Sequence, residues 1–225
     1  EWRLHARLFG GRRFLGFPVL IAAFVAGAAA ALAATGTETE RVVAGLHAFA
    51  LAFGLYSGTA GFAGSDMLEN VFGELTLVLS SAATLPLSRR WLLGAFLLKD
   101  AAYYGVLFVL PMAVGIVPLV GLSATTPVVV GTLWASLVLS FVAGMAVTVA
   151  GIALRTRGAP VWALGAVLGG VVSLAWLAGH GGTLWRVFVS DDGGVASALG
   201  LAAGTVAVGA LSLRVYDPTY SEPTR

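Results

Sequence analysis

The chain has 225 residues, of which 58% are hydrophobic and 11% charged, and its formal net charge is +2. Soluble domains carry roughly 25% charged residues, so this composition excludes an ordinary soluble enzyme and predicts an integral membrane protein. The absence of cysteine excludes disulfides, thiolate metal sites and cysteine catalysis. The small basic excess is typical of residues placed at membrane edges, and we expect no nucleic-acid partner.

Residues 1–13 precede the first apolar segment. Trp2 and Phe9 follow helical spacing, while Arg3 and Arg7 share another face. This pattern predicts an interfacial helix lying flat on the membrane, with a basic flank that only sets orientation as the alternative. The uncharged run that follows, 14–37, has 24 residues. It exceeds the roughly 7–15 apolar residues of a signal peptide, so we expect a retained membrane helix.

Six transmembrane helices are predicted along the chain. The third and fourth come from one uncharged run of 54 residues, 101–154, which is far too long for a single span. Turn-forming residues at 123–127 divide this run. Pro111 and Pro118 are expected to kink the third span, because proline removes a backbone donor. The predicted spans are 14–34, 42–64, 101–122, 128–154, 159–179 and 195–213.

Small residues four positions apart occur in the first and sixth predicted spans. Gly27 and Ala31 form one such pair, and Gly200 and Gly204 form the other. Small residues at this spacing let helix backbones approach closely in membranes. We therefore expect these two pairs to be helix-packing faces.

The basic residues indicate the orientation of the chain. With six spans both termini lie on one side, and that side carries eleven of the thirteen Lys and Arg residues. Arg41 and Arg186 alone lie on the other side. The positive-inside rule therefore places both termini in the cytoplasm, together with the tail 214–225. The predicted fold is an all-α integral membrane protein, with residues 1–225 forming one transmembrane domain in the cell membrane.

The stretch 65–100, between the second and third spans, differs from the rest. It contains Asp66, Glu69 and Glu74, and then fourteen uncharged residues, 75–88. Fourteen residues give roughly 21 Å of helix, less than the ~30 Å hydrocarbon core. We expect a helical segment at the cytoplasmic face, interrupted at Pro86.

Few residues suggest catalysis or metal binding. The predicted spans contain no Asp, Glu, Lys or Arg, which argues against a proton relay. His47 and His180 are both expected near the outer side, but no carboxylate motif accompanies them, so a metal or haem site is not favoured. Ser65 and His180 are predicted on opposite sides of the membrane, which excludes proton transfer between them.

The third and fourth spans are rich in aromatic and hydroxyl side chains that could line an apolar path. The alternative is that these side chains only pack helices or face lipid. The candidate path residues are Tyr103, Tyr104, Phe108, Trp134, Ser136, Ser140 and Phe141.

The phrase LPLSRRWLLGAFLLKD at 85–100, with Glu74 upstream, resembles the membrane subunit of type-2 ABC transporters. In that family the loop between helices 2 and 3 often carries a glutamate, a leucine-rich stretch and a P-[LIV]-S-R-R-like phrase. Six spans, cytoplasmic termini and a basic amphipathic N-terminus agree with this family. One departure is that Leu75 and Thr76 stand where the family often has Lys or Arg. The matching positions are Glu74, residues 75–79, Pro86, Leu87, Ser88, Arg89 and Arg90.

The resemblance implies an ATP-driven exporter of amphipathic or lipid-like cargo. The chain has no GxxxxGK[ST] motif, so a separate ABC ATPase subunit would hold ATP and Mg, and this chain would bind no cofactor itself. A second copy or a related permease would complete the path. Arg89 and Arg90 could pair with acidic groups of the ATPase or with lipid phosphate. The residues implied in coupling to the ATPase are Glu74, Leu75, Leu77, Leu79, Pro86, Ser88, Arg89 and Arg90.

Two other functions remain as alternatives. A non-transporting membrane scaffold or assembly subunit would share the topology and need no ATPase. A membrane enzyme or haem-bearing subunit would carry a bound cofactor with visible absorbance.

Overall fold

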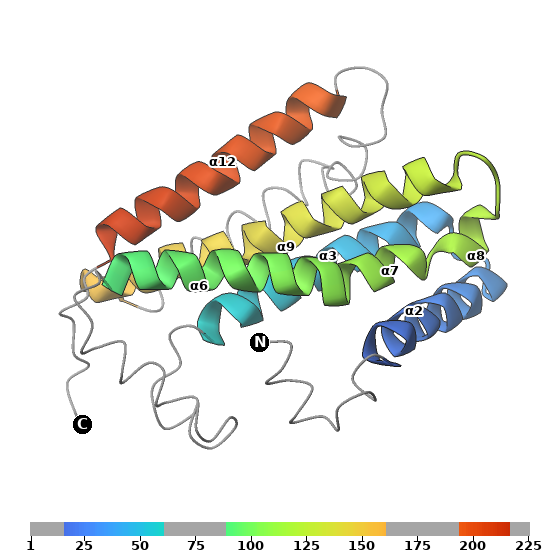
Figure 1. Cartoon of the computed structure of the whole chain (residues 1–225), viewed down its shortest axis with the longest axis horizontal. Helices are drawn as coiled ribbons and strands as arrows, with labels where there is room; N and C mark the ends of the chain where they lie inside the picture. The colour runs from blue at the N-terminus through green and yellow to red at the C-terminus, as the bar shows by residue number, and fades with distance from the viewer. Residues whose placement is uncertain (1–15, 61–88, 161–193, 217–225) are drawn as a thin grey trace.

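The computed structural model describes residues 16–60, 89–160 and 194–216 (Figure 1). These residues form helices and turns, with no strand among them. The elements are α2 (Gly16–Ala34), α3 (Thr39–Ala60), α6 (Arg89–Tyr104), the π-helical turn η3 (Gly105–Val109), α7 (Leu110–Val114), α8 (Val117–Val120), α9 (Thr126–Thr156) and α12 (Gly194–Val215).

Four helical stretches are long and apolar enough to cross a membrane. They are Gly16–Ala34, Thr39–Gly58, Leu93–Val120 and Thr126–Arg155. The prediction of a helical membrane protein is thereby confirmed in this general form. The predicted helix at 1–13 and residues 65–88 lie outside the described residues, as does almost all of the fifth span. The helix α12 coincides with the sixth predicted span, and its apolar part Ala202–Val215 is shorter than a full span.

The third span begins earlier than predicted. We expected it to start at Ala101, but α6 begins at Arg89 and continues into η3 without a break. Lys99 and Asp100 were expected to precede the third span, and in the structure they lie within the continuous helix α6. These neighbours pair with each other, with 3.3 Å between Nζ and the carboxylate.

Both prolines of the third span interrupt it, as predicted. Before Pro111 the helix widens into η3, where the Leu110 N–H donates to the Gly105 carbonyl five residues earlier. Such π turns accommodate a lost backbone donor. Before Pro118 the chain leaves the helix at Gly115 and resumes as α8. Gly121 then ends the segment with a φ of 77°, a conformation that favours glycine.

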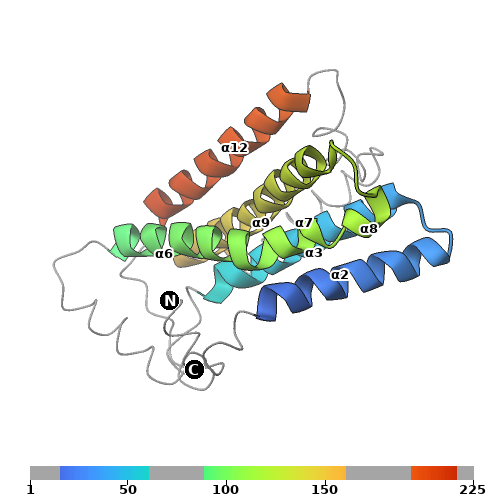
Figure 2. The same cartoon turned by 45° about the vertical axis from the view of Figure 1, so that its right-hand side comes forward.

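The helices form one bundle around α9. The α3 helix packs along α9 in the most extensive contact of the bundle, and α2 lies against α7 and α8. The α12 helix packs on α9 and meets α6 near its C-terminal end, then diverges from the bundle toward its N-terminal end (Figures 1 and 2).

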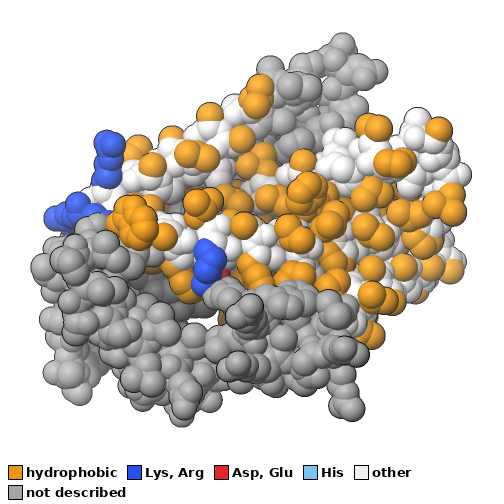
Figure 3. Space-filling model, viewed as in Figure 1, with side chains coloured by type: hydrophobic (Ala, Val, Ile, Leu, Met, Phe, Trp, Pro, Cys, Tyr) orange, Lys and Arg blue, Asp and Glu red, His pale blue; other side chains and the backbone are white. Residues whose placement is uncertain are grey.

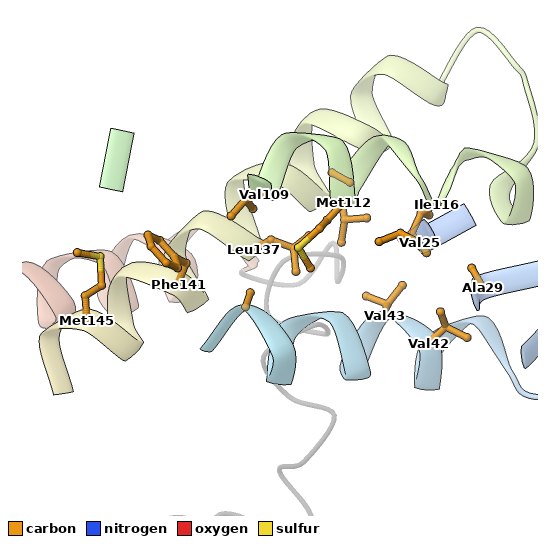
Figure 4. Packing of buried hydrophobic residues seen from close by; sticks show 13 residues of the cluster. Val25, Ala29, Val42, Val43, Val109, Met112, Ile116, Leu137, Phe141 and Met145 are labelled. Carbon is orange, nitrogen blue, oxygen red and sulfur yellow. The ribbon is translucent and has the colours of Figure 1, made fainter. Parts of the chain in front are cut away.

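The buried core lies where α3, α9 and the α7 region meet. Its largest fully buried side chains include Phe141, Met112, Ile116, Leu133 and Leu137. Figure 4 shows side chains of this cluster pointing into the space between α3, α7 and α9, with Val25 reaching in from α2. The outer surface of the described helices is also largely apolar, as expected for helices in lipid (Figure 3).

Glycines allow the close approach of α3 and α9. A Cβ on Gly54 would overlap the Phe141 carbonyl, and one on Gly144 would overlap the Leu51 carbonyl. A Cβ on Gly58 would lie 2.8 Å from the Thr148 Cβ. Residues Gly54 and Gly58 are four apart on α3, which is the small-xxx-small spacing of membrane helix contacts.

The two glycine pairs that we expected to pack do not do so within the described bundle. A Cβ on Gly27, Gly200 or Gly204 would meet nothing within 4 Å among these residues, and Ala31 is exposed. Packing at these two pairs therefore stays a prediction, because spacing identifies a smooth helix face but not its partner.

Apart from the Lys99–Asp100 pair within α6, the charged side chains of the described helices lie toward the two ends of the bundle. The turn between α2 and α3 carries Glu38 and Arg41, which form an exposed ion pair of 3.4 Å. The opposite end carries Arg90, Arg157 and Arg214, where α6 begins and where α9 and α12 end. In Figure 3 most of the blue Lys and Arg side chains lie at the end where α6 begins, and another lies near the middle of this face.

Candidate functional site

A histidine and a serine form a buried polar pair between α3 and α9. His47 Nε2 lies 2.9 Å from Ser136 Oγ, and His47 Nδ1 lies 2.9 Å from the Val43 carbonyl. Because a carbonyl can only accept, Nδ1 carries a hydrogen. His47 is 4% exposed and Ser136 has no exposed surface. An ionisable residue inside a membrane-length helix is the default starting point for a functional site.

The polar strip continues along α9. The Ser136 Oγ also lies 2.8 Å from the Leu133 carbonyl, and Ser140 Oγ donates to the Ser136 carbonyl at 3.1 Å. One turn beyond Gly144, Thr148 Oγ1 lies 2.9 Å from the Leu55 carbonyl of α3. In apolar surroundings an unmade hydrogen bond is costly, so the Thr148–Leu55 and His47–Ser136 contacts hold α3 against α9.

The distance of 2.9 Å between His47 Nε2 and Ser136 Oγ falls within the range of about 2.6–3.2 Å expected between a nucleophile and its general base. Ser136 has no exposed surface, so in this conformation it cannot meet a substrate. The geometry therefore serves helix packing here. Chemistry at Ser136 would require α3 and α9 to separate.

Aromatic rings surround this strip on the side of α6. The Phe53 ring stacks on Phe108 at 4.4 Å and on Phe141 at 5.3 Å, and it meets the edge of Tyr104 at 5.2 Å. Phe49 and Phe17 extend the cluster from Phe108 to the outer surface. A continuous aromatic layer therefore runs from the lipid-facing surface to the buried Phe141.

The π turn η3 is tied to α9 by a tryptophan. The Trp134 Nε1–H donates to the Gly105 carbonyl at 2.8 Å, the same carbonyl that accepts from Leu110 N–H. The kink of the third span is thus bonded to the fourth. Movement of α6 would be transmitted to α9 at this point.

The structure brings most of the predicted path residues into one region. Tyr104, Phe108, Trp134 and Phe141 share the aromatic layer or its border, and Tyr103 meets Tyr104 edge to face at 5.4 Å. Ser136, Ser140 and Phe141 are buried. In this conformation the residues pack against one another, so a path through them stays a prediction that requires the helices to part.

The third span carries a buried charge that the sequence analysis placed outside the membrane. Asp100 is 6% exposed, and the Lys99 ammonium lies 3.3 Å from its carboxylate and 4.1 Å from the centre of the Phe96 ring. Both residues fall within the span-length segment Leu93–Val120. The predicted span 101–122 contains neither residue, so the expectation of charge-free spans stays a prediction, while the longer segment carries one buried carboxylate.

Sequence reasoning did not predict the burial of Asp100, because it took Lys99 and Asp100 as the end of the cytoplasmic stretch 65–100. A signal was present, since an adjacent Lys and Asp can neutralise each other inside an apolar run. It also missed the pairing of His47 with Ser136. No sequence spacing connects two residues that are 89 positions apart.

Most residues implied in coupling lie outside the described part of the chain. These are Glu74, Leu75, Leu77, Leu79, Pro86 and Ser88. Arg89 is the first residue of α6, and Arg90 is exposed, with its Nε donating to the Tyr216 carbonyl at 3.1 Å. Among the described residues no group of three or more His, Asp or Glu could hold a metal ion.

No protein-family model, no curated protein and no solved structure matches this chain.

Proposed function

We propose that the chain is the permease subunit of an ABC exporter, driven by a separate ATPase subunit that holds ATP and Mg. Its cargo would be amphipathic or lipid-like. One observation carries the proposal. The P-[LIV]-S-R-R-like part of the phrase ends in Arg89 and Arg90, and α6 begins at Arg89 and leads into a span-length segment. The phrase therefore stands directly before a membrane helix, as a coupling segment would.

The distribution of charge supports an orientation with both termini in the cytoplasm. The arginines at the start of α6 and the ends of α9 and α12 share one end of the bundle. The other end has Arg41, which is paired with Glu38. The positive-inside rule assigns the arginine-rich end to the cytoplasm of a cell membrane. An ATPase would bind at that end.

A continuous helix from Arg89 to η3 supports a lever mechanism. An ATPase that displaced the stretch before Arg89 would move α6 as one body, and the bond from Trp134 to Gly105 would pass that motion to α9. Opening between α3 and α9 would expose the aromatic layer and the serines. This lining has little charge, so it suits an amphipathic cargo better than an ion.

The proposal is tested by replacing Leu77 and Leu79 with aspartate. An apolar helix in a groove loses its contact when charges enter the interface, so we expect the ATPase to be lost from the purified complex. The matched control is Leu122→Asp, an exposed leucine at the opposite end of the bundle, which should retain the ATPase. Retention of the ATPase by the Leu77 and Leu79 variant would overturn coupling at this stretch.

Asp100 favours a second candidate, a proton-coupled carrier. A buried carboxylate in a span is typical of proton pathways. Efflux of the amphipathic dye rhodamine 6G from cells distinguishes the proton-coupled carrier from the ATP-driven exporter. Efflux abolished both by a protonophore and by Asp100→Asn would favour the carrier, and efflux that survives both treatments favours the ATP-driven exporter.

A further inference from the structure

Two arginines from different helices are held by the end of α12. The Arg90 Nε of α6 donates to the Tyr216 carbonyl at 3.1 Å, and the Arg157 Nε, just after α9, donates to the Val215 carbonyl at 2.8 Å. These two carbonyls are consecutive at the C-terminus of a helix, where carbonyls lack intrahelical partners and cations are favoured. The end of α12 therefore brings two guanidinium groups together.

Among the described residues, both guanidiniums bond through Nε alone. Each fork has two Nη atoms with four N–H donors, and these make no hydrogen bond with the residues that the structure describes. Fixing the side chains through Nε also reduces the rotamer freedom that a ligand would otherwise have to restrict. The forks form a pre-organised pair of donors, which we call the arginine clamp (Arg90 and Arg157).

The described residues offer no carboxylate to neutralise the clamp. Glu38 and Glu40 lie at the opposite end of the bundle, and Asp100 is buried beside Lys99. Arg214, in the last turn of α12, adds a further positive charge at the same end. The described residues at this end therefore contribute positive charge, which suits an anion.

The apolar surface beside the clamp indicates what kind of anion fits. On α6, Trp91 is 64% exposed and Leu98 is 73% exposed, and Leu211 of α12 is 62% exposed. A tryptophan next to a basic cluster at the end of membrane-length helices is typical of the headgroup region. A ligand here would meet positive donors at one end and an apolar surface at the other.

We propose that the arginine clamp binds the phosphate of an anionic phospholipid, with the acyl chains lying on the exposed apolar side chains of α6 and α12. Arginine forks match phosphate oxygens in bidentate geometry. The bound lipid would join α6, α9 and α12 at one end of the bundle. This inference does not rest on the proposed transport function.

Native mass spectrometry of the purified full-length protein tests the proposal. The protein is titrated with phosphatidylglycerol and, in parallel, with phosphatidylcholine, and the bound lipid is counted for the wild type and Arg90→Gln/Arg157→Gln. Each arginine is expected to contribute about fivefold, so the double variant should bind phosphatidylglycerol about 25-fold more weakly. Phosphatidylcholine binding should change little.

Arg41→Gln is the matched control, because it removes the same charge at the opposite end of the bundle. An equal loss in this variant would show a general charge effect and overturn the clamp. Displacement of phosphatidylglycerol by equimolar glycerol 3-phosphate would also overturn it, in favour of a soluble anion site. If the double variant does not fold, Arg90→Gln and Arg157→Gln are measured singly. Each must then lose more binding than Arg41→Gln.

Discussion

The contact of α3 with α9 and the outer face of α12 use similar residues in opposite ways. Both helix surfaces contain glycines four positions apart. At Gly54 and Gly144 the glycine admits the backbone of the neighbouring helix, whereas at Gly200 and Gly204 nothing in the described bundle approaches. The α3–α9 contact also has interhelical hydrogen bonds from His47 and Thr148.

This difference shows what makes a helix contact specific in lipid. Apolar side chains gain little by leaving a solvent that is itself apolar, so close packing and interhelical hydrogen bonds decide which faces meet. Glycine spacing alone is insufficient. A smooth face becomes a contact where a hydrogen-bonding side chain, such as Thr148, lies beside it.

The largest predicted effect comes from Gly54→Ala. The added Cβ would overlap backbone atoms of Phe141, which cannot move aside as a side chain could. We expect a loss of about 3 kcal/mol in the free energy of unfolding. Reversible unfolding in mixed dodecyl maltoside and dodecyl sulfate micelles measures it. Gly204→Ala is the control and should change stability little, and equal losses in both variants would remove the distinction between the two surfaces.

A smaller effect is expected from the His47–Ser136 pair. His47→Leu and Ser136→Ala should each destabilise the protein by about 1–2 kcal/mol, because each removes a buried hydrogen bond between α3 and α9. The double variant should reveal a coupling energy of about 0.6–1.7 kcal/mol in the same unfolding assay. Fully additive losses would mean that the 2.9 Å contact contributes no interaction energy.

Removing the hydroxyl of Thr148 tests the same contact at its other end. Thr148→Val keeps the shape of the side chain but loses the bond to the Leu55 carbonyl. We expect a loss of about 0.6 kcal/mol. Thr132→Val is a suitable comparison, since Thr132 bonds only to Val128 in its own helix. A larger loss in that variant would contradict the role of Thr148 between helices.

The smallest effect is expected at the exposed ion pair of the α2–α3 turn. Glu38→Gln removes an interaction between two largely exposed side chains. Such pairs contribute about 0.5 kcal/mol or less, and salt screens them. Stability should therefore be almost unchanged in 0.5 M salt, and a large loss there would show that this turn has a structural role.

The sequence predicted those parts of the fold that depend on composition along one helix. The first, second and fourth predicted spans match α2, α3 and α9 within a few residues at the described ends, and both prolines interrupt the third. These features are local, because the length of an apolar run and the missing N–H of proline affect only the helix in which they occur.

Features that depend on two segments were not predictable. The inward direction of Gly54, the bond from His47 to Ser136 and the bond from Trp134 to Gly105 all require knowledge of which helices meet. The burial of Asp100 was not predictable for a related reason, because it depends on which helices pack around α6. The candidate path residues could be chosen from their residue types, but their burial in this conformation could not be predicted.

The proposal that this chain is one half of an ATP-driven exporter is tested most directly by the subunit composition of the complex that contains it. We would purify the complex gently from its native membrane and measure its native mass. Two copies of this chain, or one copy and a related permease, together with two ATPase chains, is the predicted result. This chain alone, or with partners that lack nucleotide-binding motifs, would contradict the claim and favour the scaffold function.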